Sequence, residues 1–199
     1  MNDRIGIRRL MTSLLVAVLG LVIVVGATGC ASSDEELIRA TITKSMDLLK
    51  NPTEETLSPY LEDSQFDMSS LEKYGIDPYE FLSHCFAKFD YSVDEVRIDG
   101  KEATASLTLN NVDLVTAAQT AAVGITSNLD EYNELLASEN AEQEIMKVFM
   151  QSFYELVDST EESVDSSAEL TFTKDGDEWV VDKESIVAMV EKMYASIEI

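Results

Sequence analysis

The stretch from Arg97 to Asn110, RIDGKEATASLTLN, decides the fold of this chain. Its Asp99-Gly100 dipeptide predicts a tight turn between two antiparallel strands. Beyond the turn, every second position is apolar: Ala103, Ala105, Leu107 and Leu109. Polar residues fill the positions between them. This period of two predicts a strand with one face on a core and the other facing water. Residues 91–98 supply the preceding strand, although their alternation breaks at Asp94-Glu95.

A second hairpin is predicted over residues 164–181. Its first strand alternates through Val164, Ala168, Leu170 and Phe172, its turn is Asp175-Gly176, and its return strand carries Trp179, Val180 and Val181. A two-stranded hairpin is marginally stable alone, because it buries too little apolar surface. We therefore expect both hairpins to join in one antiparallel four-stranded sheet.

Helical patterns precede, separate and follow the two hairpins. Ser33-Asp34-Glu35-Glu36 matches a capping box, and the helix after it places four apolar residues on one face: Ile38, Ile42, Met46 and Leu49. Asn51-Pro52 and Asp77-Pro78 predict two more helix starts, each with proline at the first position. The second of these carries an apolar stripe: Phe81, Leu82, Cys85, Phe86 and Phe89.

Four more helices are expected, over residues 114–127, 129–138 and 141–158 and from Ser185 onward. Asn140 and Gln143 are the predicted caps of the helix over residues 141–158. The helix from Ser185 is expected to bury Ile186, Val190, Met193 or Tyr194, and Ile197. Helices that cover one face of an antiparallel sheet make an α+β fold in two layers. We predict one acidic α+β domain over residues 34–199.

Charge and composition limit the classes of function. The chain has 199 residues, 26% of them charged and 45% hydrophobic, with a formal charge of −24. Residues 30–199 hold 11 basic and 37 acidic residues, a net charge of −26. Such a domain repels nucleic-acid phosphates and anionic lipid headgroups, and it suits cations or a basic protein partner.

The first 29 residues differ from the rest. Arg4, Arg8 and Arg9 precede an apolar run from Leu10 to Val25, the order of a signal peptide. The run then ends in small residues at Gly26-Ala27-Thr28-Gly29, directly before Cys30. An uncleaved membrane anchor and an ordinary secreted protein are the alternatives, since a spanning helix needs about 20 apolar residues. Only Cys85 remains besides Cys30, so a disulfide scaffold is not indicated.

The four residues Ala27-Thr28-Gly29-Cys30 resemble the lipobox of bacterial lipoproteins. Ala27 departs from the leucine that this motif prefers. The resemblance implies cleavage after Gly29, acylation of Cys30 and anchoring on the extracytoplasmic face of a bacterial cell membrane. Residues 1–29 would be the signal peptide, and residues 30–33 the lipidated cysteine with a short tether. More than one acyl chain gives durable anchoring, which holds an acidic domain on the bilayer despite charge repulsion.

The order of elements resembles the cystatin-like and nuclear-transport-factor-like folds found in many small bacterial lipoproteins. The matching features are the helix pair at 34–62, the hairpin at 91–112 and the hairpin with Trp179 at 164–181. The three helices between the hairpins and the terminal helix depart from the simple pattern. Relatives of this shape include binding domains and enzymes, so the fold does not decide the function.

The sequence contains no recognisable combination of catalytic residues. His84 is the only histidine, and Cys85 beside it lies on an apolar stripe, so a buried thiol is expected. The acidic hairpin turns match no calcium loop, and no cofactor motif is present. The aromatic residues that would line a ligand pocket, if the core leaves one open, are Tyr60, Tyr74, Tyr79, Phe86 and Trp179.

The sequence therefore predicts a membrane-anchored lipoprotein with a non-catalytic domain that binds a small ligand or a basic protein. The alternative is a small hydrolase or isomerase that uses carboxylates in a pocket between sheet and helices. A third hypothesis is a cation-binding surface. An open cavity under the sheet would favour the enzyme, and a filled core would favour the binding domain.

Overall fold

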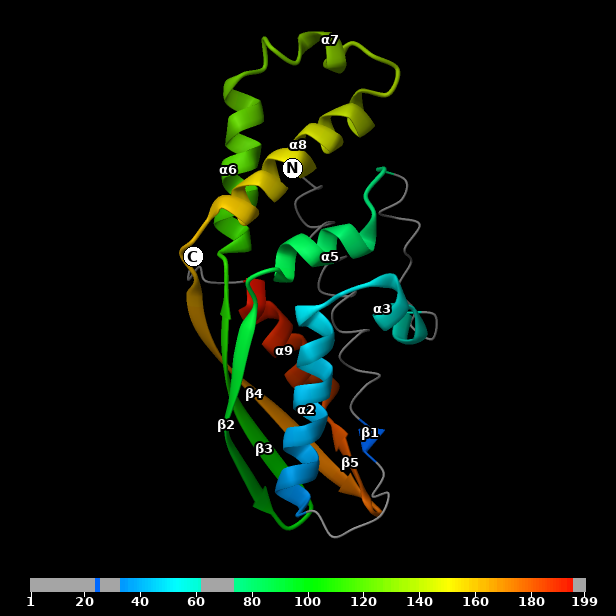
Figure 1. The fold of residues 1–199 in the computed structure, drawn as a ribbon, viewed down its shortest axis with the longest axis vertical. Helices are drawn as coiled ribbons and strands as arrows, with labels where there is room; N and C mark the ends of the chain where they lie inside the picture. The colour runs from blue at the N-terminus through cyan, green and yellow to red at the C-terminus, as the bar shows by residue number, and fades with distance from the viewer. Residues whose placement is uncertain (1–23, 26–32, 62–73, 195–199) are drawn as a thin grey trace.

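A computed structural model describes residues 24–25, 33–61 and 74–194 of the chain and has an α+β architecture. Its strands are β1 (Val24–Val25), β2 (Asp90–Asp99), β3 (Glu102–Asn111), β4 (Val164–Asp175) and β5 (Glu178–Val181). Its helices are α2 (Asp34–Lys50), α3 (Glu54–Leu61), α5 (Pro78–Phe86), α6 (Leu114–Ser127), α7 (Asn133–Leu136), α8 (Ala141–Ser159) and α9 (Lys183–Tyr194). Figure 1 shows the sheet at one end of the molecule and α6, α7 and α8 extending beyond the other.

Both predicted hairpins are present, and they join as predicted. Gly100 and Gly176 adopt positive φ angles of 64° and 63°, the backbone region that glycine enters without steric cost. β2 pairs with β3, β4 pairs with β5, and β3 pairs with β4, all of them antiparallel. The broken alternation at Asp94-Glu95 corresponds to a register shift between Val93 and Glu95, a β-bulge. The antiparallel four-stranded sheet is thus confirmed.

A fifth strand, β1, was not predicted. Val24 and Val25 pair antiparallel with Val180 and Trp179, so the order in the sheet is β1-β5-β4-β3-β2. The outer edge of β5 presents backbone N–H and C=O groups that need partners, and β-branched valines suit an extended strand. The sequence analysis assigned these two residues only to the apolar run before Cys30.

Two helix starts follow the predicted capping chemistry. Ser33 Oγ accepts from the Glu36 backbone N–H, and the Glu36 carboxylate accepts from the Ser33 N–H, which completes the capping box of α2. Asp77 Oδ1 accepts from the Tyr79 N–H at 2.8 Å, ahead of Pro78 at the first position of α5. These caps satisfy N–H groups that a helix terminus leaves without intrahelical partners.

Other predicted helix ends are wrong by a few residues. α3 begins at Glu54 instead of Pro52, because the Thr53 hydroxyl accepts from the Thr56 N–H and starts the helix there. α9 begins at Lys183 instead of Ser185, because Asp182 accepts from the Glu184 N–H.

The predicted helix over residues 129–138 is wrong in most of its length. Only α7, four residues long, is helical, and successive turns make up the rest of the segment. Asn140 occupies the N-cap position of α8 as predicted, but its side chain makes no hydrogen bond to the backbone there.

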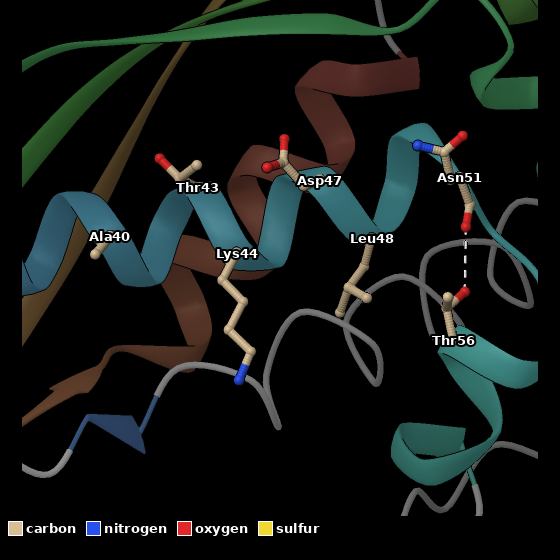
Figure 2. Close-up of a pocket in the computed structure, with 7 residues that line it drawn as sticks. All are labelled: Ala40, Thr43, Lys44, Asp47, Leu48, Asn51 and Thr56. Carbon is tan, nitrogen blue, oxygen red and sulfur yellow. Dashed lines mark hydrogen bonds between the residues drawn. The ribbon is translucent and has the colours of Figure 1, made fainter. Parts of the chain in front are cut away.

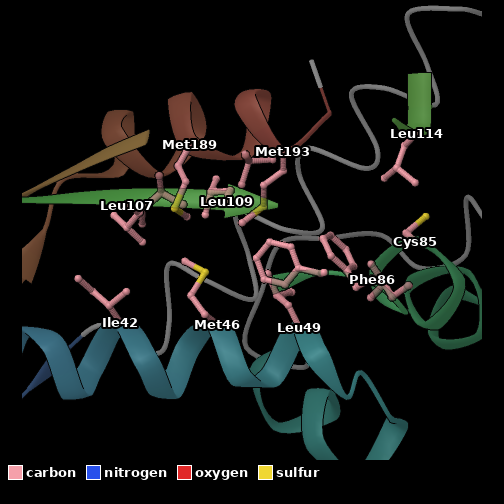
Figure 3. Close-up of a cluster of buried hydrophobic side chains, with 14 of the residues drawn as sticks. Ile42, Met46, Leu49, Cys85, Phe86, Leu107, Leu109, Leu114, Met189 and Met193 are labelled. Atoms are coloured by element: carbon pink, nitrogen blue, oxygen red, sulfur yellow. The ribbon is translucent and has the colours of Figure 1, made fainter. Parts of the chain in front are cut away.

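The core lies on one face of the sheet and is filled (Figure 3). Ala103, Ala105, Leu107 and Leu109 of β3 are at most 4% exposed, whereas the polar residues between them are half-buried. The predicted face of α2, the described part of the predicted face of α9 and the apolar stripe that begins in α5 are buried in the same cluster: Ile38, Ile42, Met46, Leu49, Ile186, Val190, Met193, Phe81, Leu82, Cys85, Phe86 and Phe89. Ile197, also predicted to be buried, lies outside the described residues. Burial of this apolar surface is the main driving force for the fold.

Residues 112–163 form a helical arm between two strands that are direct neighbours in the sheet. Asn111 at the end of β3 pairs with Val164 at the start of β4, so the arm leaves and re-enters at one point. α6 packs on α8 in the arm, and α5 packs against α8 at its base. Figure 1 shows this arm projecting away from the end of the sheet that carries the two Asp-Gly turns.

Gly124 of α6 offers a test of local helix energetics. Its φ is not positive, and a Cβ atom added there meets nothing within 4 Å. We expect Gly124→Ala to raise the free energy of unfolding by about 0.5–1 kcal/mol, because alanine loses less backbone entropy in a helix. Urea denaturation monitored by circular dichroism measures the change. A loss of stability would show that the open space at Gly124 is required by the fold itself.

Candidate functional site

The predicted lipid-attachment site, Cys30, and the cleavage position, Gly29, lie outside the described residues. Ser33 caps the start of α2, which lies beside β4. Lys174 of β4 donates to both oxygens of Asp34, at 2.9 and 2.7 Å, and its ammonium lies 5.3 Å from the ring centre of Trp179. The hydrogen bond from Lys174 lowers the pKa of Asp34. The first helical turn is therefore tied to the sheet at the end that carries the Asp-Gly turns.

The aromatic residues proposed for a pocket lie in different surroundings. Phe86 and Trp179 are each 1% exposed and belong to the packed core. Tyr79 is half-buried against that core, and the Tyr74 hydroxyl lies 3.3 Å from a carboxylate oxygen of Glu142 on α8. The side chain of Tyr60 lies outside the described residues. Phe86 and Trp179 therefore contribute to the packed core between sheet and helices.

One depression lies on the outer side of α2 (Figure 2). Its volume is about 610 Å³, and it is open to solvent. Two helical rows and one residue of α3 line it: Ala40, Lys44 and Leu48; Thr43, Asp47 and Asn51; and Thr56. Lys44 is the one cation among these lining residues. Such a shallow surface suits weak polar contacts more than the enclosed binding of a small molecule.

The second depression lies on the face of the sheet that the helices leave open. It measures about 420 Å³ and is lined mainly by residues of β3, β4 and β5: Glu102, Ala103, Thr104, Thr171, Thr173, Val180, Val181 and Asp182. Neighbouring side chains satisfy one another across this face: Thr108 donates to Asp94 at 2.8 Å, and Asn110 donates to Asp165 at 2.6 Å. The open face is therefore a hydroxyl-rich and acidic surface.

His84 and Cys85 do not form a catalytic pair. The Cys85 side chain is buried, and burial raises the pKa of its thiol well above the ordinary value, which keeps it protonated. His84 instead turns toward α8, where its Nδ1 lies 3.0 Å from Asp158 Oδ1 and its ring stacks on Tyr154 at 4.0 Å between centres. The histidine therefore joins α5 to the helical arm.

Lys88 completes this junction. Its ammonium donates to the backbone carbonyl oxygens of Val157, Asp158 and Thr160 at the end of α8. These carbonyl groups have no intrahelical partner at a C-terminus, where a cation is also favoured by the helix dipole. The base of the arm is thus held by two side chains that the sequence analysis did not assign to any role.

Five carboxyl groups of the described residues have a lowered pKa. In those ranges, every carboxyl with a displaced pKa has it lowered: Asp34 by Lys174, Asp90 by Lys50, Asp94 by Ser92, Glu95 by Arg97, and Asp182 by Glu184. A general acid needs a carboxyl whose pKa is raised toward neutrality. The same ranges contain no group of three or more His, Cys, Asp or Glu residues placed to hold a metal ion.

These lowered values predict how stability depends on pH. A carboxyl whose pKa is lower in the folded state stabilises the fold above its unfolded pKa, and this contribution is lost as the pH falls through the folded value. Repulsion within a chain of charge −24 acts oppositely, because it weakens as other carboxylates take up protons. We therefore expect maximal stability near about pH 5 and a steep decline below about pH 4.

Urea midpoints measured from pH 3 to pH 8 test this expectation. The variant Asp90→Asn, which removes the carboxylate paired with Lys50, should show a shallower decline at the acidic end. Stability that keeps rising below pH 4 would contradict the assignment of these five carboxyl groups.

The feature that sequence reasoning missed is the uncharged character of α6. Residues 114–129 contain no Asp, Glu, Lys or Arg in a chain that is 26% charged. Three large apolar residues are exposed in this part of the chain. Val123 of α6 is 61% exposed, Leu129 just after α6 is 47% exposed, and Leu136 of α7 is 46% exposed. The absence of charge over 16 residues was visible in the sequence, but only the structure shows which side of the helix stays uncovered.

The chain matches no family model, and comparisons with curated proteins and with solved structures likewise give no match. In the ranges that the structure describes, none of the helices has the length and apolar character needed to cross a bilayer.

Proposed function

We propose that this protein is a lipid-anchored lipoprotein on the extracytoplasmic face of a bacterial membrane and that its acidic domain is a non-catalytic binding module. The anchor is Cys30, acylated after cleavage of the bond between Gly29 and Cys30. This cleavage would also remove β1, so that β5 becomes an edge strand of a four-stranded sheet in the mature protein. The domain contacts its ligand or a basic protein partner through exposed surfaces, in the manner of an interaction domain.

The observation that carries the binding part of this proposal is the filled core. An enzyme of this architecture needs a concavity between sheet and helices, and here Trp179, Phe86 and the faces of α2 and α9 occupy that space. The depressions beside α2 and on the open face of the sheet are open to solvent and lie elsewhere. The displaced carboxyl pKa values also run downward, which suits fixed surface charge.

The anchoring part is supported by the order of basic residues, apolar run and small residues before Cys30. The position of Asp34 adds to it. Because Asp34 is tied to Lys174, a tether of residues 30–33 holds the bilayer near the Asp-Gly turns. Figure 1 places the helical arm at the opposite end of the domain, where a partner can reach it.

Intact mass and fatty-acid labelling test the anchor. In the wild type we expect a polypeptide that begins at Cys30 and carries acyl chains, recovered with the membrane fraction. Cys30→Ala should abolish the label. Cys85→Ala is the matched control, because it removes the other cysteine of the chain and should leave the label intact. A wild-type protein without acyl mass, or one that retains residues 1–29, overturns the proposal.

A further inference from the structure

The sheet edge at β5 carries a partner strand that comes from the segment before Cys30. Val24 lies opposite Val180 and Val25 lies opposite Trp179 in antiparallel register, and Figure 1 shows β1 alongside β5. Both valines of β1 precede Cys30, so the proposed cleavage removes them. The structure thus shows what covers this edge in the uncleaved chain: a short extended segment of apolar, β-branched residues.

The backbone of β5 is oriented to bind such a segment. The Asp182 N–H donates to the Thr171 carbonyl oxygen of β4 at 2.8 Å. Backbone groups of a strand point alternately to its two sides, so those of Val181 and Trp179 point outward, away from β4. Removal of β1 frees these N–H and C=O groups, and the free backbone of an edge strand is a template for pairing with another chain.

The opposite edge of the sheet, β2, carries features that hinder strand addition. A β-bulge interrupts its register between Val93 and Glu95, and Arg39 of α2 donates to the Val93 carbonyl oxygen at 2.6 Å. Bulges and charged side chains are the means by which proteins ordinarily protect a sheet edge. β5 instead has an apolar run over residues 179–181, in which Val180 is 39% exposed. Of the two edges, β5 is therefore the one suited to accept a strand.

The surroundings of β5 indicate the chemistry of the strand that fits there. The depression of about 420 Å³ on the open face of the sheet is lined in part by Val180, Thr171 and Thr173. Directly opposite residues of antiparallel strands share one face, so the side chain opposite Val180 lies beside this depression. Residues 175–184 hold five acidic residues and one basic residue, a net charge of −4. Apolar side chains therefore fit the centre of the added strand, and Lys or Arg fits its ends.

We propose that the β5 edge is a strand-acceptor site for a basic protein partner, which adds an extended segment of apolar β-branched residues flanked by Lys or Arg. The segment pairs antiparallel with β5, in the position that β1 holds in the uncleaved chain. This inference deepens the proposed function and rests on it, because cleavage before Cys30 opens the edge. Main-chain hydrogen bonds supply the affinity of such strand addition, and side-chain contacts supply its specificity.

Binding of a synthetic peptide to the acylated protein in detergent micelles tests the proposal. The probe is fluorescein-labelled Lys-Thr-Val-Val-Thr-Lys, and fluorescence anisotropy measures its affinity. The matched peptide Lys-Thr-Val-Pro-Thr-Lys keeps the charge but lacks one backbone N–H, so it should bind at least about tenfold more weakly. Glu-Thr-Val-Val-Thr-Glu should lose at least about as much affinity, because its ends are repelled by the acidic residues around β5.

Variants of the protein locate the site of binding. Val180→Lys places a positive charge at the centre of the β5 edge and should weaken binding at least about tenfold. Ile98→Lys is the matched control, because Ile98 is 40% exposed on the other edge strand, β2, and the change adds the same charge. Raising the salt from about 20 mM to about 500 mM should weaken binding, because it screens attraction between opposite charges. Equal effects of the two variants, or equal affinities for the valine and proline peptides, overturn the proposal.

The uncleaved chain separates failure of the edge from failure of the processing. Cys30→Ala should keep residues 1–29, so that β1 covers the edge and the probe does not bind. Adding Val25→Pro removes the N–H that faces Trp179 and should restore binding, whereas adding Val25→Ile should not. Restored binding supports the acceptor edge even where the wild type retains residues 1–29 and the proposed processing fails. Absence of binding at about 1 mM probe, in both the mature chain and the variant with Val25→Pro, overturns the acceptor edge whatever the state of Cys30.

Discussion

Replacing Trp179 with alanine is expected to lower the free energy of unfolding by about 3–5 kcal/mol, the range found when a large buried aromatic side chain is truncated. Trp179 is 1% exposed and lies in the cluster that joins the sheet to its helices. Truncation both forfeits apolar burial and leaves a cavity that packed neighbours fill only in part. Urea denaturation followed by circular dichroism measures the loss as a lower midpoint with an unchanged slope.

Val180→Ala is the matched control, because the next residue of β5 points to the other face and is 39% exposed. We expect a change within about 0.5 kcal/mol for this variant. A Trp179→Ala protein that loses less than about 1 kcal/mol would show that the ring is not a required part of the core, and the pocket interpretation would return.

Replacing Phe153 with alanine should be about as costly, again about 3–5 kcal/mol. Phe153 is 3% exposed on α8, and its ring lies 6.1 Å from that of Phe81 on α5, centre to centre. This contact joins the helical arm to the rest of the domain, together with His84 and Lys88. Hydrogen exchange should therefore show the greatest loss of protection in α6 and α8.

Phe149 provides the control on the same helix. Its ring lies 6.3 Å from that of Phe153, but it is only half-buried, so Phe149→Ala should cost about half as much. Equal losses for the two variants, or loss of protection spread evenly over the sheet, would contradict a junction centred on Phe153.

The parts of the fold that were predicted correctly from the sequence are those determined by residues close to one another in the chain. The alternation of β3 identified its buried residues one by one, since a strand changes face at every residue. The capping box of Ser33 and Glu36 located the start of α2 because both partners of its hydrogen bonds lie within one helical turn. The predicted four-stranded sheet followed from two turn dipeptides.

The wrong starts of α3 and α9 are local, since the hydroxyl of Thr53 and the carboxylate of Asp182 set them. Other features depend on contacts between distant residues. Whether Trp179 lines a pocket or fills a core is decided by how α2 and α9 close over the sheet, and no short pattern records that. The same explanation covers α7, which is shorter than the predicted helix. The connection between α6 and α8 is set by the packing of these two helices rather than by local propensity. The side that α6 exposes is settled in the same way, by its contact with α8.

The insertion of the arm between β3 and β4 also has a consequence for folding kinetics. Pairing Asn111 with Val164 closes a loop of about fifty residues, which costs roughly 3 kcal/mol more entropy than closing a two-residue turn. If α6 and α8 first associate as a helical hairpin, that hairpin already brings the two strand ends together. The transition state for folding should then contain a formed arm, so substitutions between α6 and α8 slow refolding, whereas Val180 and its neighbours mainly affect unfolding.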